Sequence, residues 1–253
     1  MQNTTKTFTV AMGADLPPAA ALGCPCADLI YTVQGGRLCR CGAPSAAGAL
    51  LGFYPTPGAP APDPPTLARM LLGQARSCRA GGILLDLPED DAGMALAARL
   101  SPMLTGRGLP VFLPVTLAEA DPRARLILPS AISGGSFTGM LDHFTARFPP
   151  HRLCLELVRR RHDFPIPSPD PSGIPLPRDT FDALLQRAGG HHTSPDLCAH
   201  YFTYADQNGK PRLTLFDDAA TAHRMRMHAQ QAGITAVFAL YAEWGSALAD
   251  IFA

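Results

Sequence analysis

Short apolar runs recur along the chain, and most are followed by a segment with apolar residues at helical spacing. The runs predict strands at residues 7–12, 28–33, 49–54, 82–87, 109–115, 126–129, 153–158 and 236–241. The spacing predicts helices at 66–79, 90–105, 136–148, 179–188, 219–232 and 246–252. Continuously apolar strands are typical of a parallel sheet that is buried on both faces. The pattern therefore predicts an α/β fold, a single (β/α)8 TIM barrel over residues 1–253.

Two hairpins are expected within this alternation. Gly35-Gly36 predicts a tight turn from the second strand into residues 37–41. A second turn at Asn208-Gly209 predicts a small hairpin insertion at residues 200–216, before the last helix and strand. A doubly wound open sheet is the alternative architecture. The chain has neither the G-x-G-x-x-G nor the G-x-x-x-x-G-K-[ST] motif, so nucleotide binding is unsupported.

Composition narrows the classes of function. The 253 residues are 47% hydrophobic, which excludes a largely disordered chain. Lys+Arg and Asp+Glu both number 21, so no global positive charge favours nucleic acid as a partner. No apolar run approaches the ~20 residues of a membrane helix, and we expect no membrane contact. Residues 1–10 lack the apolar core of a secretory signal, so we expect a cytoplasmic protein.

The carboxyl end of the fourth strand carries the most informative chemistry, because TIM barrels place their sites at this end of the strands. Alternation along the strand turns Leu84, Asp86 and Pro88 into the barrel. Asp86 is either a ligand contact or a carboxylate satisfied by loop amides or an arginine. Glu89 lies one residue beyond the inward set, where it is typical of the acidic first turn of the next helix.

The order of segments resembles glycoside hydrolase family 18, particularly its bacterial spore-associated N-acetylglucosaminidase branch. Residues 81–88 lie without gaps over the family's fourth-strand motif D-G-x-D-x-D-x-E. Residues 149–153 are similar to the family's turn before the seventh strand, and 216–221 to its acidic helix start. The resemblance spans nearly the whole chain and implies the same barrel fold.

The resemblance also implies a loss of catalysis. In the family, the glutamate of the motif protonates the glycosidic oxygen, and its position here is Pro88. The family's Met-x-Tyr-Asp on the sixth strand, which helps to hold the N-acetyl group, reads Leu128-Pro129-Ser130-Ala131. Our first hypothesis is a pseudoenzyme without glycosidase activity that binds an N-acetylglucosamine-containing glycan or peptidoglycan fragment of the cell wall or spore, or that serves as a scaffold.

The alternative is an active glycoside hydrolase of the N-acetylglucosaminidase or chitinase type that uses Asp86 and Glu89. A one-residue slip along a strand reverses the face, so Glu89 requires a bulge at Pro88 to reach the barrel interior. Glu156 stands at a seventh-strand position where the family usually has glycine, and an acid there would enter the cleft. Glu243 is the other candidate helper.

Aromatic side chains are the usual floor of a sugar subsite, and the family presents a tryptophan from its eighth strand. The candidates here are Tyr31, Tyr54, Tyr204, Tyr241 and Trp244, the last being the only tryptophan of the chain. Trp244 has a second interpretation, as an indole that packs between helices near the C-terminus.

Two further clusters have weaker signals. Cys24-Pro25-Cys26 and Cys39-Arg40-Cys41 supply four thiols for a zinc site, although structural sites usually space their cysteines by two to four residues. We expect no metal and no cofactor. Arg159-Arg160-Arg161 after the seventh strand is either an anion site at the barrel mouth or a solvated loop. The oligomeric state is left open by the sequence.

Overall fold

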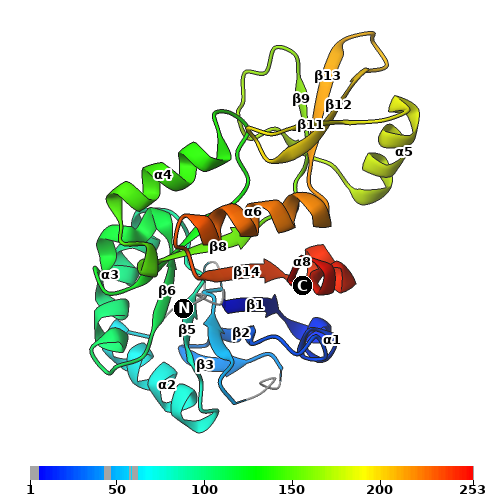
Figure 1. Ribbon diagram of the computed structural model, residues 1–253. Coiled ribbons are helices and arrows are strands. Elements are labelled where there is room, and N and C mark those ends of the chain that lie inside the picture. Colours follow the sequence, from blue (N-terminus) through cyan, green and yellow to red (C-terminus); the bar gives the residue numbers. More distant parts are fainter. Residues whose placement is uncertain (1–5, 43–46, 57, 59–61, 253) are drawn as a thin grey trace.

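Eight parallel strands close into a barrel in the computed structural model, which confirms the predicted TIM barrel (Figure 1). The structure describes residues 6–42, 47–56, 58 and 62–252; the first five residues, on which the interpretation of the N-terminus partly rests, lie outside them. The barrel strands in chain order are β1 (Lys6–Ala11), β2 (Cys26–Gln34), β4 (Leu50–Phe53), β5 (Gly82–Leu85), β6 (Val111–Pro114), β7 (Arg125–Pro129), β8 (Leu153–Leu157) and β14 (Ala236–Leu240). Pairing of β1 with both β2 and β14 closes the ring.

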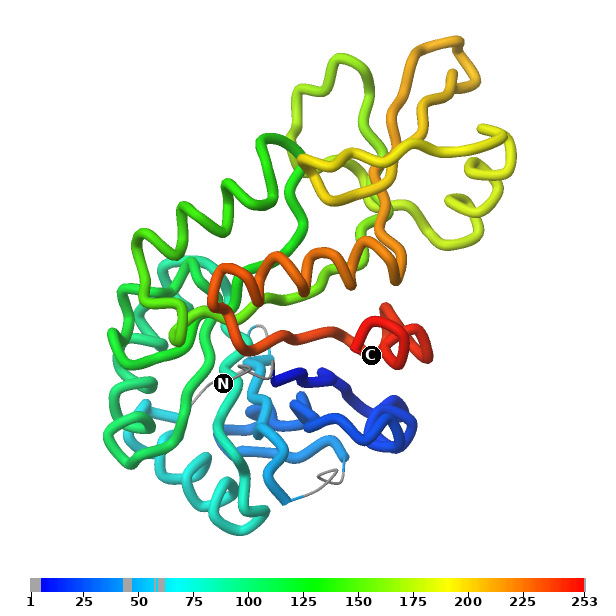
Figure 2. Tube along the Cα trace, viewed as in Figure 1, coloured from blue at the N-terminus to red at the C-terminus, as the bar shows by residue number. Residues whose placement is uncertain are grey.

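Helices cover the outside of the barrel (Figure 2). They are α1 (Leu16–Ala20), α2 (Pro64–Ser77), α3 (Asp91–Thr105), α4 (Phe137–Arg147), α6 (Ala219–Gln231), α7 (Tyr241–Trp244) and α8 (Leu248–Phe252). Polar side chains cap three of the long helices: Asp90 bonds to the amide of Gly93, Ser136 to that of Gly139, and Asp218 to that of Thr221. None of the helices in the described ranges is long and apolar enough to cross a membrane.

The alternation of strand and helix has two irregularities, and both agree with the predicted elements. The strand β3 (Arg37–Arg40) pairs with β2 through the Gly35-Gly36 turn, where both glycines have positive φ. Between β6 and β7 the chain forms only the 3-10 helix η2 (Val115–Ala120). Prolines flank η2 at positions 114 and 122, which leaves too little apolar sequence for a full helix.

Three phenylalanine rings fill the middle of the barrel. Phe8 stacks on Phe238 with 4.9 Å between ring centroids, and Phe112 meets Phe238 edge-on at 5.3 Å. All three are almost completely buried. We call them the phenylalanine plug, and they divide the interior into a mouth at the carboxyl ends of the strands and a floor at the amino ends.

The insertion is larger than the expected hairpin. The strands β12 (Ala199–Ala205) and β13 (Pro211–Phe216) pair around Asn208-Gly209 as predicted, and belong to a five-stranded antiparallel sheet. Its other strands are β9 (Arg161–Pro165), β10 (Ile174–Pro175) and β11 (His192–Ser194), and α5 (Arg178–Ala188) packs against the sheet through Phe181. Figure 1 shows this unit beyond the carboxyl end of β8. The sequence missed β9 because its polar residues, such as Arg161 and His162, obscure a strand pattern.

Candidate functional site

A cavity of about 240 Å³ opens at the mouth of the barrel. Its walls are mostly aliphatic side chains and prolines, and Phe238 of the plug is its base. The residues that line it are Val10, Leu29, Leu84, Leu85, Asp86, Glu89, Pro114, Val115, Thr116, Ile127, Pro129, Glu156, Phe238 and Leu240. A concave, largely apolar site with a few polar groups is the usual form of a ligand pocket. Asp86, Glu89 and Glu156 are its acidic residues.

The turn between β5 and α3 brings both Asp86 and Glu89 to the cavity. Strand alternation turns Leu84 inward and Asp86 follows it at the strand end, as predicted. Glu89 reaches the same cavity because the chain leaves the strand after Leu85 and folds tightly onto α3. A Cβ at Gly93 would overlap the Pro88 carbonyl oxygen, and Asp90 caps the helix. The alternative hypothesis requires a bulge at Pro88, but β5 ends at Leu85, so Glu89 reaches the cavity from the turn before α3 and not from a bulged strand.

Glu156 enters the cavity from the opposite side, on β8. Its neighbour in the interior row, Cys154, is completely buried, and the Glu156 side chain lies above it. Within the described part of the chain, its carboxyl forms no ion pair with any of the arginines near the end of β8. The acid therefore faces the mouth rather than a structural partner, as expected from its inward position.

Burial changes the acidity of two of these carboxyls. The pKa of Glu156 is raised from 4.5 to about 7. Loss of water is the largest cause, and the negative charges of Glu243, Asp86 and Glu89 contribute the rest. Solvent reaches Asp86, but the cavity walls displace much of its water, which raises its pKa, as does the charge of Glu89. A protonated carboxyl beside ionised ones can donate a proton or a hydrogen bond at neutral pH.

Glu243 stands close enough to repel Glu156 but is held by other contacts. Its carboxylate accepts a hydrogen bond of 3.0 Å from the backbone amide of Arg159, whose guanidinium donates to the Glu243 carbonyl at 2.9 Å. Glu243 does not line the cavity, so its effect on a bound ligand would be electrostatic.

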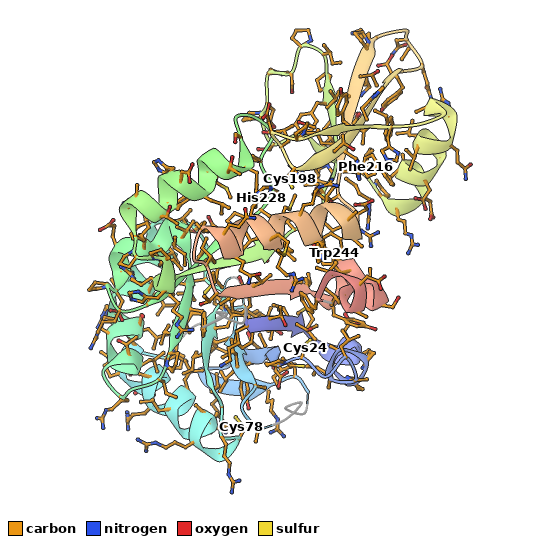
Figure 3. All side chains as sticks on the ribbon, viewed as in Figure 1. Cys24, Cys78, Cys198, Phe216, His228 and Trp244 are labelled. Atoms are coloured by element: carbon orange, nitrogen blue, oxygen red, sulfur yellow. The ribbon has the colours of Figure 1, made fainter. Side chains whose placement is uncertain are left out.

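Trp244 and Tyr31 are in the core, which corrects their expected place among the ligand contacts. Trp244 is 3% exposed, and its indole N–H donates to the Leu157 carbonyl at 2.8 Å. Figure 3 labels Trp244 between α6 and α8. Arg159 covers the ring from 5.2 Å. Tyr31 is 2% exposed and belongs to the apolar layer between the barrel and α2. The helix-packing interpretation of Trp244 matches this geometry, because the α7 turn folds it back onto β8.

The other three candidate tyrosines also lie outside the mouth cavity. Tyr54 follows β4, and burial raises its pKa with a further contribution from Cys41. Tyr241 begins α7 and packs between two parts of the core. Tyr204 lines a separate groove of the insertion, between α5 and β12. In the described structure Asp86, Glu89 and Glu156 line the cavity and the aromatic candidates do not, so their parts in ligand binding stay predictions.

The cysteine and arginine clusters are separated by the fold. Cys26 begins β2, whereas Cys39 pairs with Thr32 near the far end of that strand. In the described ranges, no group of three His, Cys, Asp or Glu residues is placed to hold a metal. Arg160 is neither a mouth anion site nor part of a solvated loop: it is 2% exposed and its guanidinium pairs with Asp217 at 2.7 Å.

Comparisons with known proteins support the fold. No family model matches the sequence, and no curated protein sequence matches it. Among solved structures, a chitinase from Chromobacterium violaceum ATCC 12472 has a TM-score of 0.66 at 15% identity, with 98% of each chain covered. The fold is that of the family 18 chitinases. The Bacillus megaterium spore cortex-lytic enzyme SleL has a TM-score of 0.63 at 11% identity, over 95% of this chain and 71% of that enzyme.

A third solved structure is a mutant of the glycoside hydrolase family 18 chitinase from Cycas revoluta in complex with (GlcNAc)4. Its TM-score is 0.60 at 13% identity, over 97% of this chain and 96% of the chitinase. The predicted resemblance to a family 18 barrel is thus confirmed at the level of the fold.

Two groups of the cavity were missed by the sequence. Thr116 carries an exposed hydroxyl just beyond the end of β6, and Phe238 forms the base from β14. Thr116 was detectable, because it follows directly after a predicted strand end. Phe238 was not detectable. Strand alternation predicts that it points into the barrel, but not that it lies deep enough to form the base of a cavity.

Proposed function

We propose that this family 18-like barrel binds an N-acetylglucosamine-containing glycan at its mouth without hydrolysing it by the family's mechanism. The observation that carries the proposal is the cavity at the carboxyl ends of the strands with Asp86, Glu89 and Glu156 on its walls. Carboxyl oxygens accept hydrogen bonds from sugar hydroxyls, and the aliphatic walls can contact the C–H faces of a sugar ring. Pro88 has no group that can protonate a leaving oxygen.

A second candidate function is hydrolysis by Glu89 and Asp86. It is favoured by the position of Glu89, whose side chain lines the cavity beside Asp86. Two carboxyls in unlike environments are the basis of glycoside hydrolysis, with the more protonated one as the general acid. Glu156, with its pKa of about 7, would remain available as a hydrogen-bond donor to the substrate.

One experiment separates these functions. We expect N-acetylglucosamine oligomers to raise the melting temperature of the protein, because a ligand at 100 times its Kd adds about 2.7 kcal/mol to the free energy of unfolding. The same oligomers, linked to a chromophore, should give no release. Asp86→Asn should reduce the shift, and Asp142→Asn, on the exposed face of α4, should leave it unchanged.

Three other results would contradict glycan binding at the mouth without hydrolysis. Chromophore release that disappears in Glu89→Gln would establish the hydrolase and reject the pseudoenzyme. Absence of both a shift and release over the full series of oligomers and muramyl fragments would reject glycan binding at the mouth. An equal loss of the shift in Asp86→Asn and Asp142→Asn would place the glycan elsewhere on the molecule.

A further inference from the structure

A second cavity lies at the floor of the barrel, opposite the mouth. It measures about 440 Å³ and is lined by Pro110, Pro122, Arg123, Arg125, His151 and Arg152. These residues come from the amino ends of β6 and β7 and from the 3-10 helix η3 (Pro150–Arg152), which precedes β8. Three guanidinium groups and an imidazole meet there, and no carboxylate is part of the lining.

Two of the three arginines are fixed by contacts outside the cavity. Arg152 donates to the carbonyls of Ala124 at 3.0 Å and Asp121 at 3.2 Å. Arg123 reaches the Asp121 carboxylate at 3.4 Å and the Pro102 carbonyl at 3.2 Å. These contacts hold two cations at the rim in defined positions, so the arrangement is present before any ligand arrives.

Arg125 differs from its neighbours. It begins β7 and points into the barrel interior, where its guanidinium lies 5.5 Å from the centre of the Phe112 ring in the plug. It is half-buried, and within the described residues its N–H groups have no hydrogen-bond acceptor or ion-pair partner. A guanidinium has five N–H donors in a planar fork, and those of Arg125 are open to solvent, since Arg125 is not among the described residues with a buried, unbonded side-chain atom. An acceptor from outside the chain would satisfy them.

The acid nearest to these arginines is already committed. Asp121 is completely buried, and its carboxylate accepts from Thr105 at 2.7 Å, Ser101 at 3.0 Å and the Arg123 amide at 3.0 Å. Burial alone would raise the pKa of Asp121, but these hydrogen bonds lower it below its usual value. Asp121 therefore stays ionised and offsets the charge of Arg123, whereas among the described residues Arg125, His151 and Arg152 have no ion-pair partner.

We propose that the floor cavity is a binding site for a phosphate or diphosphate group of a small molecule. A phosphate presents several charged oxygens that match the arginine fork in pairs. Arg125 would supply the inner contacts, and Arg123, Arg152 and His151 would surround the outer oxygens. The cavity is far larger than the ~30 Å³ share of one water in the liquid, so a diphosphate or a phosphorylated sugar also fits. The phenylalanine plug separates this site from the mouth.

The test uses the full chain with inorganic phosphate, diphosphate and hexose 6-phosphate, each compared with chloride at equal ionic strength. We expect saturable heat by titration calorimetry and a rise in melting temperature with at least one of them. The ligand that binds most tightly tells whether the source is the free anion or a phosphorylated sugar. Arg125→Met should weaken that binding about tenfold or more, the usual size of losing charge-assisted hydrogen bonds.

Two variants control the result. Arg99→Met removes an equally charged residue from the exposed face of α3 and should bind as the wild type does. If Arg125→Met does not fold, Arg123→Gln tests the same site at the surface, where the side chain is 55% exposed, with a smaller expected weakening. Wild-type protein that shows no more response to any phosphate compound than to chloride overturns the proposal. Equal binding by wild type and both cavity variants overturns it as well.

Discussion

Charged side chains are treated in two opposite ways near the carboxyl end of β8. Within the strand, Glu156 projects into the mouth cavity with no cation paired to it in the described structure, and its pKa rises to about 7. Three residues beyond the strand, Arg160 is almost completely buried and its guanidinium holds both oxygens of Asp217, at 2.7 and 2.9 Å. The backbone amide of Asp217 also donates to the Arg160 carbonyl at 3.1 Å.

The comparison distinguishes a charged pair that stabilises the fold from a charged side chain that has no ion-pair partner in the described structure. Arg160 and Asp217 stand where the chain leaves the barrel for the insertion and where it returns, so their pairing fixes the neck of that unit. Glu156 has no such duty, because β8 is held by its neighbours through main-chain pairing. The same contrast distinguishes Arg125 at the floor from Arg152, which is tied to two carbonyls. Half-buried charged groups without an ion-pair partner among the described residues thus mark the two cavities.

The largest expected effect comes from removing the ion pair between Arg160 and Asp217 at the neck of the insertion. Arg160→Met should lower the free energy of unfolding by about 3–5 kcal/mol, because it leaves the Asp217 carboxylate buried without its partner. Urea denaturation followed by circular dichroism measures the loss. The double variant Arg160→Met with Asp217→Leu should recover part of it, since no unpaired charge then remains. A single variant as stable as the wild type would show that the pair does not hold the neck.

Removing the charge of Glu156 is expected to raise the free energy of unfolding, by less than the loss of the Arg160–Asp217 pair lowers it. The folded-state pKa of Glu156 lies above its ordinary 4.5, so the folded protein binds more protons than the unfolded chain between pH 4.5 and 7. Stability contributed by this group is present below pH 4.5 and is lost as the pH rises through 7. The loss is on the order of 3 kcal/mol for a shift of this size.

Glu156→Gln removes that dependence. The variant should match the wild type near pH 4.5 and exceed its free energy of unfolding by up to about 3 kcal/mol at pH 8. Urea denaturation at the two pH values measures this difference, and Glu119→Gln on the exposed surface is the control. Parallel pH profiles of wild type and Glu156→Gln would mean that Glu156 is not held in a protonated state by the cavity.

The sequence allowed the barrel to be predicted because buried parallel strands need continuous apolar runs, and those runs are local. The inward direction of Asp86 and Glu156 follows from the same alternation. Glu89 was named as a candidate, but the way it reaches the cavity was not predictable, because it depends on the tight turn in which Gly93 approaches Pro88. The aromatic candidates lie outside the cavity for a related reason: composition identifies a tryptophan or a tyrosine, but its place depends on the layer to which the next turn brings it.

Trp244 gives the smallest and most discriminating of these tests. Trp244→Phe keeps an aromatic ring but removes the N–H that donates to the Leu157 carbonyl, at the end of the strand that carries Glu156. We expect a loss of about 1–2 kcal/mol in the free energy of unfolding, because a buried carbonyl loses its donor and the smaller ring packs less completely. The glycan-induced melting shift should stay unchanged, since the indole does not line the mouth. A variant that keeps its stability but loses the shift would place the indole against the sugar and make the core position incorrect. The result therefore decides whether Trp244 stabilises the fold, as Arg160 does, or faces the ligand, as Glu156 does.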